Sequence, residues 1–302
     1  MDLKSKIILI SGPTASGKSN FAIKFAKKIN GEIVNADSMQ IYKELKILTA
    51  RLEKKNQQNI KHHLYGFQNV RKNFSTGHWL KIVLKKIKEI QKRNKIPVLV
   101  GGTGLYFKAL TEGLVAIPNI PKKMRNKVRD LQKKIGQKKF FNKLIKLDPF
   151  SKDKINPNDI QRSIRAYEIK QFTKISIFEW FKKTKVIFNE NDFFKIYIDF
   201  SRSDLIERIN LRVERMFKDG AVQEVKNFLK LKVPKINSAN KIIGIKEISN
   251  YLKNMHNLAE TKELIAIKTR QYAKRQITWS RGQMTNWQKI KPNNLNTLIK
   301  KF

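Results

Sequence analysis

The sequence feature that most constrains the fold is the run GPTASGKS at residues 12–19. An apolar run at residues 7–10 precedes it, and residues 21–29 carry apolar side chains at helical spacing. A strand, a turn between two glycines and a helix form the setting in which the G-x-x-x-x-G-K-S/T pattern binds phosphate. Backbone N–H groups and the positive end of the helix favour an anion there, Lys18 adds a charge, and the Ser19 hydroxyl can hold Mg²⁺. The run predicts a loop that binds a diphosphate or a triphosphate, and it leaves open which one.

Basic residues far outnumber acidic ones, which narrows the class of partner. The 302 residues include 65 Lys and Arg against 24 Asp and Glu, for a net charge of +41 at pH 7. Such an excess indicates a polyanionic partner, with nucleic acid first and an anionic membrane second. Lys, Asn and Ile are frequent along the whole chain, as an AT-rich genome would produce, so base composition accounts for part of this charge.

Other features of the composition exclude some classes of protein. The chain has no cysteine, which excludes a disulfide framework and a Cys-based zinc site. The apolar run near its N-terminus is too short for a signal peptide, and no apolar stretch approaches the length of a membrane span. We therefore expect a soluble, cytoplasmic protein with one large domain or two modest ones.

Two further strands end in residues suited to ligand contact. Residues 32–36 read as a strand that ends at Asp37, and residues 96–100 read as a buried strand that runs into Gly101-Gly102-Thr103-Gly104. Open α/β sheets bind ligands at the carboxyl ends of their strands, and glycines let the backbone approach a ligand closely. Asp37 is therefore a candidate site residue, although Asp also caps helices and position alone leaves both roles open. Thr103 stands where a nucleotide hydrolase often has a Mg²⁺-binding Asp, which disfavours ATP hydrolysis.

The middle of the chain is predicted to be helical and strongly basic. After a connector broken by Pro118 and Pro121, residues 122–146 hold eleven Lys and Arg and one acid, Asp130. A charge run of one sign suits an RNA backbone better than a merely solvated face does. A second basic helix is expected at residues 160–170, and a third, with interleaved aromatic side chains, ends near Trp279.

Two other segments complete the sequence-based picture. Residues 79–92 form an amphipathic helix with its apolar side chains on one face. The adjacent His62 and His63 face different ways on any regular element, so we expect them to be structural or RNA-facing rather than metal ligands.

Taken together, these motifs resemble the bacterial tRNA dimethylallyltransferase family, also called tRNA isopentenyltransferases. The resemblance spans nearly the whole chain. It is carried by GPTASGKS at 12–19, ADSMQIYK at 36–43, TAR at 49–51, HHL at 62–64, VGGTGLYFKAL at 100–110, NPNDIQRSIRAYE at 156–168, RVERMF at 212–217, KIIGIK at 241–246 and TRQYAKRQITWSRG at 269–282.

The resemblance implies a fold, a reaction and partners. The fold is α/β, a parallel sheet core flanked by helices similar to P-loop NTPases, formed by residues 1–114 and 191–302, with a helical tRNA-binding insertion at residues 115–190. The reaction transfers the dimethylallyl group of dimethylallyl diphosphate to N6 of the adenosine next to the anticodon on its 3′ side, position 37. The implied partners are the tRNA anticodon stem–loop and the prenyl donor, with Mg²⁺ as cofactor, no membrane and a monomeric enzyme.

The same resemblance assigns roles to individual residues. Asp37 matches the proposed general base, Thr103 a threonine near the target nucleotide, and Arg215 an arginine near the diphosphate. The diphosphate loop comprises Gly12, Pro13, Thr14, Ala15, Ser16, Gly17, Lys18 and Ser19, with Ser19 also the metal ligand. The expected tRNA contacts are Asp37, Ser38, Met39, Gln40, Thr103, Arg125, Gln161, Arg162, Ser163, Ile164, Arg165, Lys241, Gly244, Lys246, Lys274, Arg275, Gln276 and Arg281.

The sequence also departs from the family pattern, and it leaves rival functions to test. Leu48 stands where Gly is usual, Arg51 stands where Lys is usual, and residues 74–79 differ, which puts local loop geometry in doubt.

One rival is a relative that prenylates free adenine nucleotides. Others are a P-loop ATPase or kinase with an RNA-binding surface, in which Asp199 could replace the strand-end Asp, and a non-catalytic RNA-binding protein.

Overall fold

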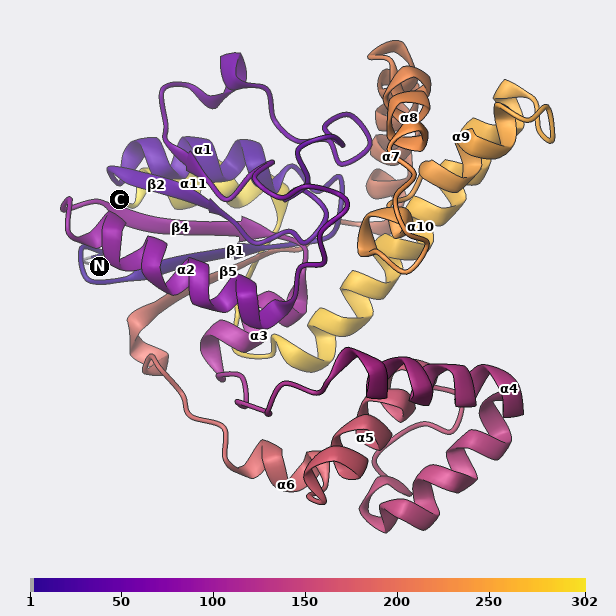
Figure 1. Cartoon of the computed structure of the whole chain (residues 1–302). Coiled ribbons are helices and arrows are strands. Elements are labelled where there is room, and N and C mark those ends of the chain that lie inside the picture. The colour runs from indigo at the N-terminus through magenta and orange to yellow at the C-terminus, as the bar shows by residue number, and fades with distance from the viewer. Residues whose placement is uncertain (1–2) are drawn as a thin grey trace. The chain divides into compact units, whose positions relative to one another are not determined.

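Two compact units make up the chain, and each is described here by itself. The computed structural model describes residues 3–302 (Figure 1). One unit combines the chain up to Thr111 with Phe188–Phe302, and we call it the sheet unit. The other, Glu112–Ile187, is the inserted unit.

Six parallel strands form the centre of the sheet unit, in the order β3-β2-β4-β1-β5-β6. Every residue of the three strands β1, β2 and β4 is buried, as is typical of a parallel sheet covered by helices on both faces. Because the strands all run the same way, the segments that follow them meet at one edge of the sheet. The strands are β1 (Ile7–Ser11), β2 (Gly31–Asn35), β3 (His62–His63), β4 (Ile96–Gly101), β5 (Phe193–Ile198) and β6 (Gln288–Ile290).

Helices make up most of the remaining regular structure. The α-helices are α1 (Lys18–Lys28), α2 (Thr76–Gln91), α3 (Gly104–Thr111), α4 (Lys122–Leu147), α5 (Ile160–Thr173), α6 (Ile177–Lys182), α7 (Arg202–Lys218), α8 (Ala221–Lys230), α9 (Ile245–Tyr251), α10 (Leu258–Gln283) and α11 (Leu295–Lys300). Short 3₁₀ turns are η1 (Lys54–Gln57), η2 (Pro149–Ser151), η3 (Glu190–Asp192), η4 (Ser238–Lys241) and η5 (Pro292–Asn294).

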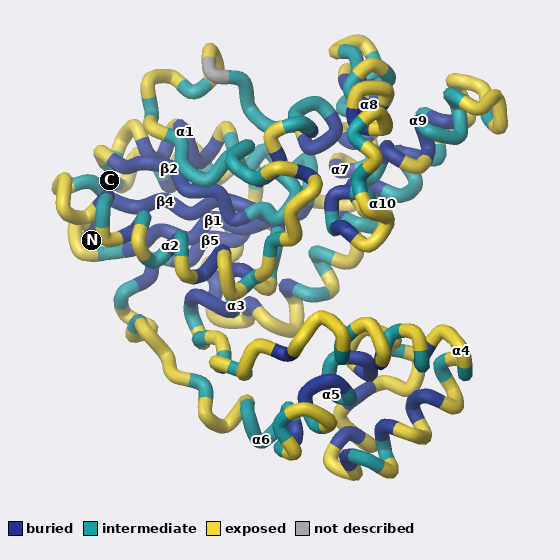
Figure 2. The backbone as a smooth tube through the Cα atoms, in the orientation of Figure 1, coloured by how far each residue is buried: buried dark blue, intermediate teal, exposed yellow. Residues whose placement is uncertain are grey.

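Two hydrophobic layers enclose the sheet, and β1 contributes to both. Ile7 and Leu9 pack in the layer with α2 and α3, whereas Ile8 and Ile10 pack in the layer with α1 and α11. This alternation follows from the two-residue period of a strand. Figure 2 shows the buried strands between their helices. The predicted α/β fold, a parallel sheet flanked by helices, is confirmed.

A second core lies among α7, α8, α9 and α10, next to the segment that follows β2. Glu224 on α8 ties that segment to the helices. Its Oε1 atom accepts hydrogen bonds from the backbone N–H of Lys46 at 2.6 Å and Ile47 at 2.7 Å, and its Oε2 atom accepts from Leu48 at 2.9 Å. A carboxylate that accepts three backbone donors holds a loop in one conformation, since each charge-assisted bond is stronger than a neutral one.

The inserted unit is helical and has small cores of its own. Helix α4 is interrupted at Gly136, whose φ of 75° and ψ of 167° are not helical. Helix α5 packs against α4 through Ile164, Val128 and Phe140. At the start of α5 the Asp159 side chain accepts a hydrogen bond from the Arg162 N–H at 3.0 Å, which caps the helix.

In residues 3–302, no helix is both long enough and apolar enough to cross a bilayer.

A close approach between two strand ends sets the shape of the carboxyl edge. A Cβ atom on Gly101, at the end of β4, would lie 2.1 Å from the carbonyl carbon of Ala36 and 2.7 Å from the Asp37 nitrogen. No real side chain tolerates such contacts, so any other residue at position 101 would push apart the segments that follow β2 and β4.

Replacing this glycine should therefore destabilise the fold. We expect Gly101→Ala to lower the free energy of unfolding by about 1–3 kcal/mol, the usual cost of overpacking. A matched control is Gly282→Ala on α10, where a Cβ would meet nothing within 4 Å. In a helix this second change should raise stability by about 1 kcal/mol or less. Urea denaturation of both variants gives the comparison, and equal effects would contradict the close-approach argument.

Candidate active site

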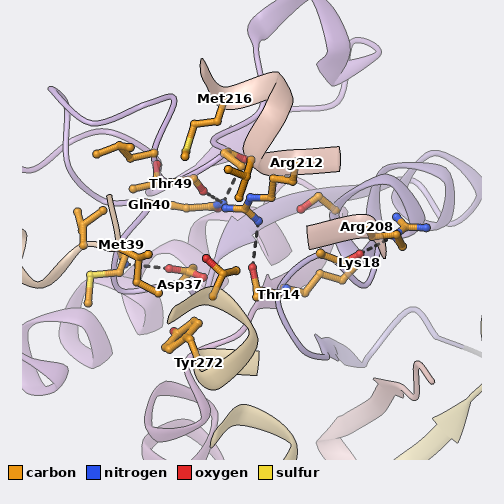
Figure 3. A pocket seen from close by; sticks show the side chains of 18 of the residues that line it. Thr14, Lys18, Asp37, Met39, Gln40, Thr49, Arg208, Arg212, Met216 and Tyr272 are labelled. Atoms are coloured by element: carbon orange, nitrogen blue, oxygen red, sulfur yellow. Dashed lines mark hydrogen bonds between the residues drawn. The ribbon is translucent and has the colours of Figure 1, made fainter. Parts of the chain in front are cut away.

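A cavity of about 710 Å³ opens at the carboxyl edge of the sheet unit (Figure 3). Its wall combines the loop after β1, the turn after β2, and side chains from α7 and α10. The lining residues that carry the argument below are Thr14, Lys18, Ser19, Asp37, Arg212 and Tyr272. The structure thus brings together the predicted phosphate loop and the predicted strand-end aspartate.

The loop at residues 12–19 has the form that the motif predicts. Gly17 adopts the left-handed conformation, with φ 82° and ψ 8°, and directly precedes α1. Lys18 Nζ donates to the Pro13 carbonyl at 3.0 Å, so the side chain curls back over its own loop. Ser16 Oγ is buried and has no hydrogen-bond partner among the described residues.

Two arginines of α7 form hydrogen bonds with the loop at residues 12–19. Arg208 Nε donates to the Ala15 carbonyl at 2.7 Å, and Arg212 Nη1 donates to Thr14 Oγ1 at 3.0 Å. They are four residues apart and therefore share one face of the helix. Arg215, the arginine predicted by resemblance, also lines the cavity but is exposed, and its role stays a prediction.

The charge of Lys18 depends on its surroundings. Burial lowers its pKa to about 8, the Asp37 carboxylate opposes this change, and the Arg212 guanidinium adds to it. The same burial lowers the pKa of Arg212, again opposed by Asp37. The site therefore holds two cations that lack full solvation, and an incoming anion would supply the missing stabilisation.

The turn after β2 holds Asp37 through a buried asparagine. Asn35 Oδ1 accepts from the Asp37 N–H at 2.9 Å, and Asn35 Nδ2 donates to the Leu64 carbonyl at 3.0 Å. Trp79 Nε1 donates to the Asn35 carbonyl at 3.0 Å. Asp37 Oδ1 in turn accepts from the Met39 N–H at 2.8 Å, so the carboxylate caps a tight turn and faces the cavity at once. Asp37 therefore caps a turn rather than a helix, and its role in the reaction stays a prediction.

Three tyrosines lie near enough to this carboxylate for its charge to affect them. Burial first and the Asp37 charge second raise the pKa of Tyr272 well above its ordinary value, and the same two causes act on Tyr65 and Tyr106. These phenols therefore stay neutral at physiological pH. Tyr106 also stacks on Trp79 at a centroid distance of 4.2 Å, which gives the wall behind the turn a rigid surface.

Gln276 on α10 links the loops that follow β1 and β4. Its Oε1 atom accepts from the Thr14 N–H at 2.8 Å, and its Nε2 atom donates to the Gly102 carbonyl at 2.9 Å. Thr103 makes a similar link, because its Oγ1 atom accepts from the Ser38 N–H at 2.9 Å. Neither Gln276 nor Thr103 is among the described residues that line the cavity.

The other predicted tRNA contacts fall into four groups. Met39, Gln40, Lys241 and Arg275 line the cavity, and Lys246, Lys274 and Arg281 are exposed elsewhere on the sheet unit. Gly244 is buried against Leu48. In the inserted unit, Gln161 and Arg162 are exposed and Arg125 and Arg165 half-buried, whereas Ser163 and Ile164 are buried in its interior.

The two positions with unusual residues act in packing. Arg51 donates to the carbonyls of Tyr42 at 2.7 Å and Lys43 at 3.1 Å, so it braces the segment that follows β2. Leu48 is buried beside Gly244. The paired histidines are also structural: His63 Nε2 lies 2.6 Å from Glu32, whose carboxylate also binds Arg93 at 2.7 Å.

A magnesium ion would find few protein ligands here. No group of three His, Asp or Glu side chains suited to a metal occurs in residues 3–302. Ser19 nevertheless lines the cavity beside Lys18, and Mg²⁺ is commonly held by one protein oxygen, phosphate oxygens and water. The donor set therefore fits an ion that arrives with a diphosphate rather than one held by the protein alone.

Sequence reasoning missed Asn35, Arg208, Arg212 and Tyr272 as site residues. The spacing of Arg208 and Arg212 on one helix face was the available signal for α7. For Asn35 the signal was weak, because an Asn two residues before an Asp is common and its other partners, Leu64 and Trp79, are distant along the chain. Tyr272 was expected only as one of the aromatic side chains interleaved along the last basic helix.

Comparison with known proteins bears on the identity of this site. The family model described as IPP transferase matches residues 40–283. A tRNA dimethylallyltransferase of Pelagibacter ubique is 63% identical over 302 residues, which cover all of this chain and 96% of the relative. One from Rickettsia massiliae is 44% identical over 93% of this chain and 78% of its own length.

Solved structures agree in fold. A eukaryotic dimethylallyltransferase acting on tRNA matches with a TM-score of 0.83 and 30% identity, over 95% of this chain and 73% of that one. The tRNA isopentenylpyrophosphate transferase of Bacillus halodurans matches with a TM-score of 0.70 and 29% identity, over 98% and 95%. These matches confirm the resemblance that the motifs indicate, and the chain belongs to the IPP transferase family.

Proposed function

We propose that this enzyme transfers the dimethylallyl group of dimethylallyl diphosphate to N6 of adenosine 37 in tRNA, which gives N6-isopentenyladenosine. The observation that carries the proposal is that one cavity is lined by both Asp37 and the phosphate loop with Lys18. The names of the relatives from Pelagibacter and Rickettsia support the same reaction. Because the acceptor would be tRNA, we further propose that the enzyme acts in the cytoplasm, as a monomer.

Asp37 is the proposed general base. The N6 amine of adenine is a weak nucleophile because its lone pair is delocalised into the ring. As N6 bonds to C1 of the donor, the bond from C1 to the diphosphate oxygen breaks and one N6 proton must leave. The Asp37 carboxylate, held by Asn35 and facing the cavity, is suited to accept that proton.

The phosphate loop and the α7 arginines would hold the leaving group. Negative charge grows on the diphosphate as the bond to C1 breaks, so fixed cations stabilise the transition state more than the ground state. Lys18, Arg212 and the exposed Arg215 line the cavity and can supply that charge. Ser19 and diphosphate oxygens would bind Mg²⁺, which adds further positive charge when present.

Apolar residues on the remaining wall suit a short prenyl chain. Met39, Leu48, Met216 and Ile242 line the same cavity as the charged groups. A five-carbon dimethylallyl group can be desolvated there while its diphosphate contacts the loop, and desolvation of that hydrocarbon would add to binding.

The charge of the inserted unit supports RNA as the acceptor. Residues 112–187 carry twenty Lys and Arg side chains against seven Asp and Glu. We propose that these residues bind the anticodon arm, and that adenosine 37 leaves its stack to reach Asp37, at a cost of about a few kcal/mol met by contacts elsewhere. An enzyme for free adenine nucleotides would not need this basic unit.

One incubation tests the reaction. Purified protein, unmodified tRNA, dimethylallyl diphosphate and Mg²⁺ should yield N6-isopentenyladenosine by nucleoside mass spectrometry. Product from AMP but not from tRNA would favour the prenyltransferase of free nucleotides. ATP hydrolysis without any prenylated product would favour the ATPase or kinase alternative and refute the proposal.

A single substitution tests the base. Asp37→Asn should lower kcat by about 10²–10⁴-fold, because the amide cannot accept the N6 proton. Its matched control is Asp199→Asn, an aspartate after neighbouring strand β5 that does not line the cavity. Single-turnover kinetics at saturating tRNA should show an intact rate for the control. Equal rates in Asp37→Asn and the wild type would remove Asp37 as the base.

The lowered pKa of Lys18 predicts how donor binding depends on pH. The lysine is protonated below a pH of about 8 and neutral above it, so affinity for an alkyl diphosphate should fall as pH rises from 7.5 to 9.5. The ligand's own charge changes little in this window, since the last pKa of a phosphate ester is about 6. Calorimetry on wild type and Lys18→Arg provides the check. The arginine variant should lose most of the pH dependence, and a flat profile in the wild type would contradict the prediction.

A further inference from the structure

The inserted unit contains a buried carboxylate surrounded by three guanidinium groups. Glu168 on α5 is 1% exposed. The three arginines, which we call the arginine cluster, contact it as follows: Arg125 Nε to Oε2 at 3.6 Å, Arg129 Nε to Oε1 at 3.7 Å, and Arg165 Nη1 to Oε2 at 3.5 Å.

These contacts leave much of the arginines' binding capacity unused. All three are longer than the roughly 2.7–2.9 Å typical of a charge-assisted N–H···O hydrogen bond. Glu168 Oε1 and Arg125 Nε are both buried and have no hydrogen-bond partner among the described residues. One carboxylate also neutralises only one of three positive charges. The arrangement is therefore electrostatically incomplete, and an anion would complete it.

Helices α4 and α5, which pack against each other, expose the arginine cluster to solvent. Arg125 and Arg129 are one turn apart on α4, and Arg165 lies one turn before Glu168 on α5. The helices are held together beneath them by the small core around Ile164. The arginine side chains retain 41%, 31% and 40% of their solvent exposure, so an external ligand can reach them.

We propose that Glu168 is a positioning residue that gathers the arginine cluster into one binding site for an RNA backbone phosphate. This inference rests on the proposed action on tRNA. Guanidinium forks match the paired oxygens of a phosphate, and three such forks held around one point bind it better than mobile side chains do. The site includes Arg129, which sequence reasoning did not single out.

The rival explanation is an ion cluster that only joins α4 to α5. The two explanations predict opposite signs for one substitution. Glu168→Gln keeps the side-chain shape and raises the net charge of the protein by one, so a simple charge effect would tighten RNA binding. If Glu168 positions the arginines, the same substitution weakens RNA binding although the protein has become more basic.

The experiment measures binding of an unmodified anticodon stem–loop by fluorescence anisotropy at several salt concentrations. We expect Glu168→Gln to raise the Kd about tenfold, or 1.4 kcal/mol, and to raise KM for tRNA while kcat at saturation stays unchanged. Glu168→Asp, which keeps the charge, should recover part of the affinity. Tighter or equal binding by Glu168→Gln, with its fold verified by circular dichroism, would overturn the proposal.

Variants of Arg129 keep the test decisive if Glu168→Gln fails to fold. Arg129→Lys retains the charge but loses the fork, and it should weaken binding more than Lys127→Gln, which removes an exposed charge from the same helix. Equal or weaker effects of Arg129→Lys would overturn the proposal. Because binding is measured without the prenyl donor, these results are independent of catalysis, and absence of product with the wild type would refute the proposed function instead.

Discussion

The close approach of the segments that follow β2 and β4 decides how the site is built. Gly101 lies against the Ala36 carbonyl without room for a side chain, so the turn that bears Asp37 and the loop that bears Thr103 share one wall. Gln276 then joins the second of these loops to the phosphate loop. The segments that follow β1, β2 and β4 thus form one connected edge of the cavity. Arg208 and Arg212 of α7 form hydrogen bonds with the first of these segments.

Much of this arrangement could be predicted from the sequence, and the exceptions have a common physical origin. The phosphate loop, the strand-end position of Asp37 and the glycine run are local patterns with a fixed period or spacing, so they are visible without a structure. Asn35 was harder to identify: its side chain bonds locally to the backbone of Asp37, but its bond to the Leu64 carbonyl forms only after β2 and the segment after β3 have packed. Glu168 was likewise part of a motif, but only folding reveals that it meets two arginines of another helix.

A positive charge on Lys18 favours binding of a diphosphate but lowers the stability of the folded protein. The lysine is fully charged in the unfolded chain up to about its ordinary pKa of 10.5, whereas the folded protein releases the proton near pH 8. Between these values the unfolded chain binds more protons, so this group's contribution to stability rises with pH. The phosphate loop thus carries a cost at neutral pH that the bound diphosphate would offset, which links occupancy of the site to the stability of the sheet unit.

The basic residues of this chain fall into two chemically different populations. Lysines number 51 and arginines 14, yet most of the arginines form a hydrogen bond or an ion pair with a defined partner or line the cavity. A lysine is a mobile point charge, whereas an arginine fixes the direction of its donors. Long-range attraction and local geometry are therefore encoded by different side chains. The number of lysines, and with it the net positive charge, can change with genomic base composition while the geometry of the arginine contacts stays the same.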